Sequence, residues 1–201
     1  MEYSKRQQVI ELARHIGILR PRDIARRGLP PEYLYQLARL GIMEQTGRGM
    51  YRLAGSVPGE SQSLVEACAR VPHGVICLLT ALRFHGITTQ TPSEIWMALE
   101  GNTRRPAASD LSFRIIRASG TMFSAGIEEH QIDGVTVRIY NLAKTIVDCF
   151  KYRNKIGIEV GLEALREGWS TRRVSMTDLW QYAKIDRVAN VMRPYLEMVS
   201  V

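Results

Sequence analysis

The stretch LPPEYLYQLARLGIMEQTGRGMYRLAG, residues 29–55, decides how the first part of the chain is interpreted. Prolines near its start and an apolar face of Leu34, Leu37 and Ala38 predict a helix that ends at Gly41. Two short β-like runs follow, IMEQ and MYRL, around the turn TGRG. Because glycine permits the positive φ angle that such a turn often needs, this pattern predicts a hairpin.

The residues before this stretch add two more helices. A capping-box pattern starts a first helix at Ser4, and Gly17 ends it. Pro21 suits the first turn of a second, short helix, with Gly28 as its stop. Three short helices followed by a hairpin are the order of a winged helix-turn-helix, so we predict this fold for residues 1–55.

The third helix leaves a polar face that suits the reading of bases. Tyr35, Gln36 and Arg39 share the side opposite the apolar face, together with Glu32, and Tyr33 lies at its margin. Gln pairs with adenine, and Arg with guanine, in the major groove. We therefore predict that this helix contacts DNA through Tyr33, Tyr35, Gln36 and Arg39.

Basic side chains around this helix can hold phosphates. Residues 1–55 contain ten Lys and Arg against five Asp and Glu, whereas the rest of the chain contains 17 against 15, so most of the net charge of +7 lies early. A local excess favours a polyanionic partner, although a merely solvated basic surface has the same composition. The predicted basic contacts are Arg20, Arg22, Arg26, Arg27, Arg48 at the tip of the wing, and Arg52. The alternative is a winged helix that serves only as a protein–protein element.

Residues 56–201 predict a second, α/β domain. The segment Ala54–Ser63 is rich in Gly, Pro and Ser and marks the boundary. A helix of about Val75–His85 is apolar on almost every side and should be buried. SEIWMALE, SFRIIRA, GIEEHQI and VTVRIY predict strands, the last two joined at Asp133–Gly134, and Asn141 then caps a return to helices. The predicted class is α+β, in which a winged helix-turn-helix precedes an α/β domain with a small, mostly antiparallel sheet and C-terminal helices.

Cysteine usage and hydropathy narrow the class of protein. Cys68, Cys77 and Cys149 lie in apolar surroundings and are interpreted as reduced core thiols of a cytoplasmic protein. The most apolar stretch, GVICLLTAL, is far too short to span a bilayer. His73, with Cys77 and Cys68, matches no common zinc spacing, so no metal and no cofactor is predicted. His85, at a predicted helix end, suits capping as a cation better than catalysis.

The alternative function is a nucleic-acid-processing, nuclease-like enzyme that a winged helix targets to its substrate. Such a site needs acidic residues and a lysine that converge at strand ends, yet VTVRIY carries no Asp or Glu. Asp148, Glu159 and Glu163 fall on predicted helices instead. The sequence also has no Walker-type phosphate loop and no G-x-S-x-G motif. We predict no catalytic residues and no enzyme.

Three segments in order carry a family resemblance. They are LARLGIMEQTGRGMYRLAG with its late Gly-Arg-Gly-x-Tyr, GVICLLTALRFHGITTQTPSEIWMALE, and VRIYNLAKTIVDCFKYRNKIGIEVGLEALREGW. Together they resemble the AbiEi-type transcriptional regulators, the antitoxins of bacterial type IV toxin–antitoxin and abortive-infection systems. Arg39, Arg48 and Tyr51 match family-like positions, whereas Tyr35 and Gln36 occupy positions that vary with the operator.

The resemblance implies a function for each domain. The winged helix is expected to repress its own operon by binding double-stranded DNA at repeated operator sites. The second domain is expected to counter a toxin that resembles a nucleotidyltransferase, without forming a tight complex with it.

Overall fold

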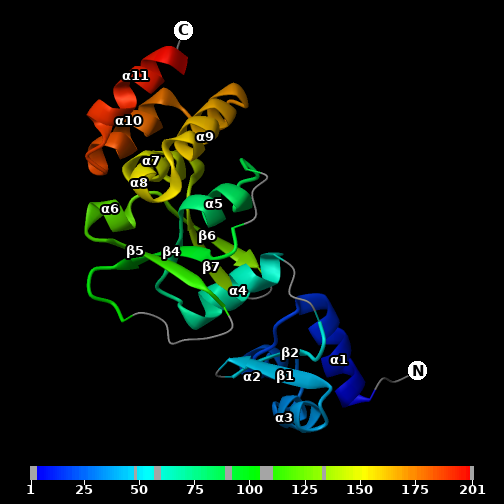
Figure 1. Cartoon of the computed structure of the whole chain (residues 1–201). Helices are drawn as coiled ribbons and strands as arrows, with labels where there is room; N and C mark the ends of the chain where they lie inside the picture. The colour runs from blue at the N-terminus through cyan, green and yellow to red at the C-terminus, as the bar shows by residue number, and fades with distance from the viewer. Residues whose placement is uncertain are drawn as a thin grey trace. The chain divides into compact units, whose positions relative to one another are not determined.

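The chain forms two compact units, which are traced in Figure 1. The first unit comprises Met1–Arg70 and Gln131–Thr136, and the second comprises Val71–His130 and Val137–Val201. The predicted domain boundary between residues 55 and 56 stays a prediction. The computed structural model describes residues 4–47, 49–56, 60–88, 92–104, 111–132 and 135–199.

The first unit follows the predicted order of helices and hairpin. Ser4 begins the first helix, where its hydroxyl accepts a hydrogen bond from the Gln7 amide at 3.3 Å. Gly17 ends that helix with a φ angle of 81° and donates its N–H to the Ala13 carbonyl. The elements are α1 (Lys5–Ile16), α2 (Pro21–Ala25), α3 (Glu32–Arg39), β1 (Met43–Gly47), β2 (Met50–Leu53) and α4 (Glu60–Arg70).

One apolar core holds the three helices and the hairpin together. Leu34 and Leu37 of α3 are 0% and 1% exposed and pack with residues of α1, α2 and the hairpin. β1 and β2 pair antiparallel. Leu19, between α1 and α2, pairs with Tyr51 of β2 through two backbone hydrogen bonds of 2.8 and 2.9 Å. The segment between the first two helices is therefore tied to the hairpin.

The second unit builds helices around a larger sheet. Its strands lie in the order β5-β4-β3-β7-β6, and the ends of β6 and β7 near their connection belong to the first unit. Figure 1 shows α9, α10 and α11 gathered at one end of this unit around α7. The elements are β3 (Val75–Ile76), α5 (Leu78–Phe84), β4 (Ile95–Glu100), β5 (Phe113–Ala118), α6 (Thr121–Ser124), β6 (Ile127–Ile132), β7 (Val135–Tyr140), α7 (Leu142–Lys151), α8 (Arg153–Ile156), α9 (Ile158–Ser170), α10 (Met176–Ile185) and α11 (Ala189–Val199).

The larger sheet is mixed, which corrects the expectation of a mostly antiparallel sheet. β3 and β4 pair antiparallel, but β4 pairs parallel with β5, and β3 pairs parallel with β7. Parallel neighbours are joined by long crossovers that leave no local signal. The sequence showed only the short connection between β6 and β7, whose turn at Asp133–Gly134 lies outside the described residues.

The predicted helix over Val75–His85 starts later than expected. Val75 and Ile76 form β3, in the middle of the sheet, and α5 begins at Leu78 after the N-cap Cys77. A strand buried on both faces and a buried helix both appear as continuous apolar runs. Periodicity therefore did not separate the strand from the helix that follows it.

The predicted helix cap at Asn141 and the predicted burial of the cysteines are confirmed. The Asn141 side chain accepts from the Lys144 amide at 2.9 Å and caps α7. Cys77 and Cys149 are buried free thiols, and Cys68, in α4 of the first unit, is also buried. Within the described part of the chain, every helix is too short or too polar to cross a membrane.

Candidate nucleic-acid interface

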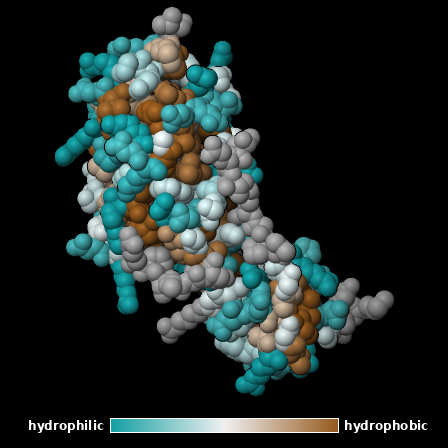
Figure 2. Space-filling model, in the orientation of Figure 1, coloured by the Kyte–Doolittle hydropathy of each residue, from teal (hydrophilic) through white to brown (hydrophobic). Residues whose placement is uncertain are grey.

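The predicted polar face of α3 is present in the first unit. Tyr35 is 49% exposed, and Gln36 and Arg39 are also exposed, because Leu34 and Leu37 turn the opposite side of α3 into the core. Tyr33 is half-buried and packs against that core, as expected for the margin of the face. Figure 2 shows hydrophilic residues, in teal, on the visible side of this unit, beside a hydrophobic strip in brown.

Two residues of this face have fixed neighbours. The Tyr35 ring meets the Tyr51 ring edge-on at 5.9 Å between centroids, and Tyr51 of the hairpin is 4% exposed, so it is packed against the core as predicted. Gln36 Oε1 accepts a hydrogen bond from Arg6 Nη2 of α1 at 2.8 Å. The face is therefore partly ordered by contacts from α1 and β2.

The four predicted arginines around α2 differ in exposure. Arg22, Arg26 and Arg27 are exposed, whereas Arg20 is half-buried. Arg27 Nη1 donates to the Asp23 carbonyl at 3.1 Å, and Arg22 Nε lies 3.9 Å from Asp23 Oδ1. These contacts leave guanidinium N–H donors on both side chains for a further acceptor.

Arg20 differs from the other three arginines in its burial and in its pKa. Burial and the charge of Arg22 lower its pKa, against the opposing effect of Asp23. Its Nη2 is buried without a hydrogen-bond partner among the described residues. Arg20 is therefore less accessible to a phosphate than its neighbours.

The hairpin arginines were predicted to complete the interface. Arg52 forms an ion pair with Glu44, the residue directly opposite it on β1, and its side chain is 18% exposed. Arg48, at the predicted wing tip, lies outside the described residues. The exposed predicted residues thus lie on α2, just after α2 and on α3, while Arg52 already has an acidic partner.

A buried charged cluster in the second unit was missed by the sequence reasoning. Lys144 Nζ lies 2.6 Å from Asp148 Oδ1, and 3.0 and 2.9 Å from the two carboxylate oxygens of Asp186. The three side chains are 1%, 5% and 0% exposed. The i, i+4 spacing of Lys144 and Asp148 in an apolar helix was a usable signal, but Asp186 is 42 positions away from Lys144.

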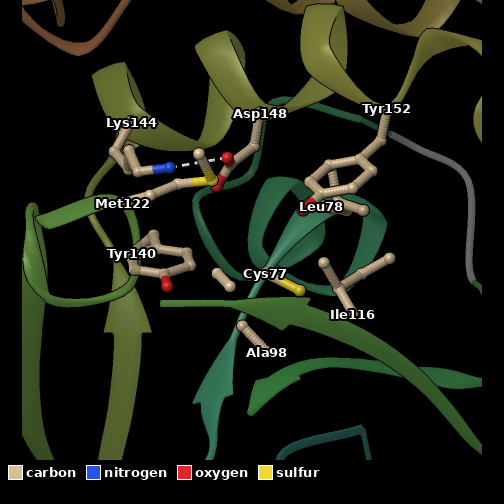
Figure 3. A pocket seen from close by; sticks show the side chains of 10 residues that line it. Cys77, Leu78, Ala98, Ile116, Met122, Tyr140, Lys144, Asp148 and Tyr152 are labelled. Atoms are coloured by element: carbon tan, nitrogen blue, oxygen red, sulfur yellow. Dashed lines mark hydrogen bonds and ion pairs between the residues drawn. The ribbon is translucent and has the colours of Figure 1, made fainter. Parts of the chain in front are cut away.

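This cluster borders a small pocket, shown in Figure 3. Lys144 Nζ lies 4.8 Å from the centroid of the Tyr140 ring, and the Tyr140 hydroxyl donates to the Phe123 carbonyl at 2.8 Å. Burial raises the pKa of Asp148 well above its usual value, against the lowering effect of Lys144. Burial likewise raises the pKa of the Cys77 thiol, and a buried, protonated thiol is a poor nucleophile.

The hydrogen-bond donors of Lys144 are therefore satisfied within the cluster. The three N–H donors of Lys144 have three carboxylate oxygens within hydrogen-bond distance. Lys151 Nζ also donates to the Asp186 carbonyl at 2.8 Å, which fastens the turn after α10 to α7. This arrangement connects elements of the fold. Across the residues that the structure describes, no group of three or more His, Cys, Asp or Glu side chains is placed to hold a metal ion.

His85 differs from its predicted role. It lies at the C-terminal end of α5, as expected, and its Nε2 is 2.8 Å from the Tyr140 carbonyl. Burial lowers the pKa of His85, and this effect exceeds the opposing hydrogen bond. This lowered pKa runs against the expectation of a capping cation, and the ring contacts the Tyr140 carbonyl of β7.

The match to known proteins lies within the first unit. No curated protein matches the chain. A family model described as "Transcriptional regulator, AbiEi antitoxin" matches residues 7–54. This segment contains most of α1 and all of α2, α3, β1 and β2. The N-terminal helices and hairpin thus match the AbiEi antitoxin family of transcriptional regulators, which confirms the resemblance for this part of the chain.

Proposed function

We propose that the chain is a DNA-binding transcriptional regulator and antitoxin whose first unit is a winged helix-turn-helix. The observation that carries this proposal is the exposed polar face of α3 within the segment that matches the AbiEi family. The backbone pairing of Leu19 with Tyr51 adds support, since it places a third extended segment beside the hairpin.

In this function α3 enters the major groove of double-stranded DNA. Gln36 and Arg39 contact base edges, with Tyr35 and Tyr33 beside them. Arg22, Arg26 and Arg27 hold phosphates near α2. Arg20 and Arg52 contribute less, because one is half-buried and the other is paired with Glu44. Arg48, at the predicted wing tip, contacts the neighbouring groove or the backbone.

The regulatory role extends to a toxin. The protein acts in the cytoplasm, represses its own operon at repeated operator sites, and counters a nucleotidyltransferase-like toxin through its second unit without a tight complex. The family match supports this role. The nuclease-like alternative gains no support from the buried cluster, because Asp148 and Asp186 share Lys144 in the protein interior instead of lining an open cleft.

Footprinting on the DNA upstream of the gene tests the proposal. The full chain should protect repeated sites, and binding should weaken steeply with salt, with a log–log slope of about 0.9 for each phosphate contact. A triple Ala variant of Arg22, Arg26 and Arg27 should lower that slope. The matched control replaces Arg166, Arg172 and Arg193, three exposed arginines of the second unit, and should leave it unchanged. Absence of protection, or a slope near zero, would refute the proposal.

A further inference from the structure

Arg6, at the start of α1, contacts the centre of the predicted reading face. Its Nη2 donates to Gln36 Oε1 at 2.8 Å, across thirty positions of sequence. A guanidinium has only N–H donors, so the oxygen of the Gln36 amide must face it. The Nε2 amino group, on the other branch of the amide, then points away from Arg6. The contact with Arg6 therefore favours one orientation of the Gln36 amide in the absence of DNA.

We propose that Arg6 is a positioning residue for base reading, and that Gln36 reads a guanine through Nε2. This inference rests on the proposed function. A two-bond contact with adenine needs both Oε1 and Nε2 to face the base. Because Arg6 occupies the space in front of Oε1, Gln36 offers the groove N–H donors instead. Guanine presents two adjacent acceptors, N7 and O6, on its major-groove edge.

The exposure of the pair makes the inference testable without disturbing the fold. Arg6 and Gln36 are both exposed, and exposed polar pairs contribute little to stability. A side chain held in its binding orientation also loses less conformational freedom when it binds. Removing Arg6 should therefore leave the fold intact and weaken the preference for guanine.

The experiment selects duplexes from a randomised pool with the full chain and then titrates each single-base change. Gln36→Ala should lose the preference for guanine at one base pair, by about 5- to 150-fold. Arg6→Ala should lose the preference for guanine at the same base pair. The double variant of Arg6 and Gln36 should lose no more of this preference than Gln36→Ala does. Arg6→Lys, which keeps a donor to Oε1, should retain part of the preference.

Two controls separate positioning from charge. Lys5→Ala removes a positive charge from the adjacent, exposed position and should weaken all duplexes equally. Replacing the selected guanine with 7-deazaguanine, which lacks N7, should weaken wild-type binding but not that of Gln36→Ala. Melting curves of each variant confirm that the fold is retained.

Each remaining outcome counts against the inference in a recognisable way. If Arg6→Ala weakens all duplexes equally, as Lys5→Ala does, Arg6 is only a phosphate contact and the proposed function stands. If the base selected through Gln36 is adenine, Gln36 does not read the base through its N–H donors alone. If the full chain selects no sequence, the inference and the proposed function fail together.

Discussion

The two units use charged residues in opposite ways. In the first, Arg22, Arg26 and Arg27 are exposed around α2. In the second, Lys144 and its two carboxylates are enclosed between α7 and the turn after α10. Exposed charges add little to stability and remain open to a partner. Buried charges must satisfy one another, because each unpaired one would cost several kcal/mol. We therefore expect substitutions of these charged residues to affect binding in the first unit and folding in the second.

The largest effect is expected from Lys144→Met. It leaves Asp148 and Asp186 buried without their cation, which should destabilise the second unit by about 3–5 kcal/mol in denaturant unfolding of the full chain. Lys184→Met, at an exposed position of α10, is the matched control and should change stability by less than about 0.5 kcal/mol. Equal stability of the two variants would contradict the comparison.

The loss of stability caused by Lys144→Met should depend on pH. The pKa of Asp148 is raised in the fold, chiefly by burial, so its folded form binds a proton more readily than its unfolded form. Such a group stabilises the fold at low pH, and this contribution is lost as the pH rises through the folded pKa. Without Lys144 the carboxyl should become still harder to ionise. The difference in stability between wild type and Lys144→Met should therefore become smaller as the pH is lowered.

A core substitution in the first unit should come next. Leu37→Ala removes a side chain that is 1% exposed and should destabilise the unit by about 2–5 kcal/mol through a cavity. Leu40→Ala, three positions later and 60% exposed, makes the same chemical change at the surface and should alter thermal melting little. Leu37→Ala should lose DNA binding only in proportion to the unfolded fraction.

Substitutions on the exposed face of α3 should affect binding without affecting folding. Gln36→Ala and Arg39→Ala should each cost about 1–3 kcal/mol of operator binding, with a smaller loss on random DNA. Their stability should stay within about 0.5 kcal/mol of wild type. Gel-shift titration beside thermal melting measures both quantities. If both variants bind operator like the wild type, the module is better described as a protein-interaction element.

The smallest effect is expected from His85. Burial, with smaller contributions from Arg173 and His130, lowers its pKa below the unfolded value, against the Tyr140 carbonyl and Glu128. Its contribution to stability is therefore complete above the unfolded pKa and is lost as the pH falls through the folded pKa. Wild type should lose more stability than His85→Gln between about pH 7 and pH 5. If wild type and His85→Gln lose the same amount of stability between the two pH values, the lowered pKa assigned to His85 is wrong.

Features that depend on neighbouring residues could be predicted from the sequence. Ser4, Gly17 and Asn141 marked helix ends, and Leu34 and Leu37 marked the buried side of α3. These predictions succeed because capping bonds and helical faces arise within a few positions of sequence. The family resemblance of residues 7–54 comes from the same compact segment. Which of the exposed residues touch DNA stays a prediction.

Features that join distant segments became apparent only in the folded chain. The parallel pairings of β3 with β7 and of β4 with β5 made the sheet mixed. Asp186 meets Lys144 across 42 positions, and Arg6 meets Gln36 across thirty. Neither pair has a local pattern, because a hydrogen bond between distant residues depends on how whole elements pack. The sequence thus located the face of α3, and the packing of α1 against it determined how Gln36 is oriented.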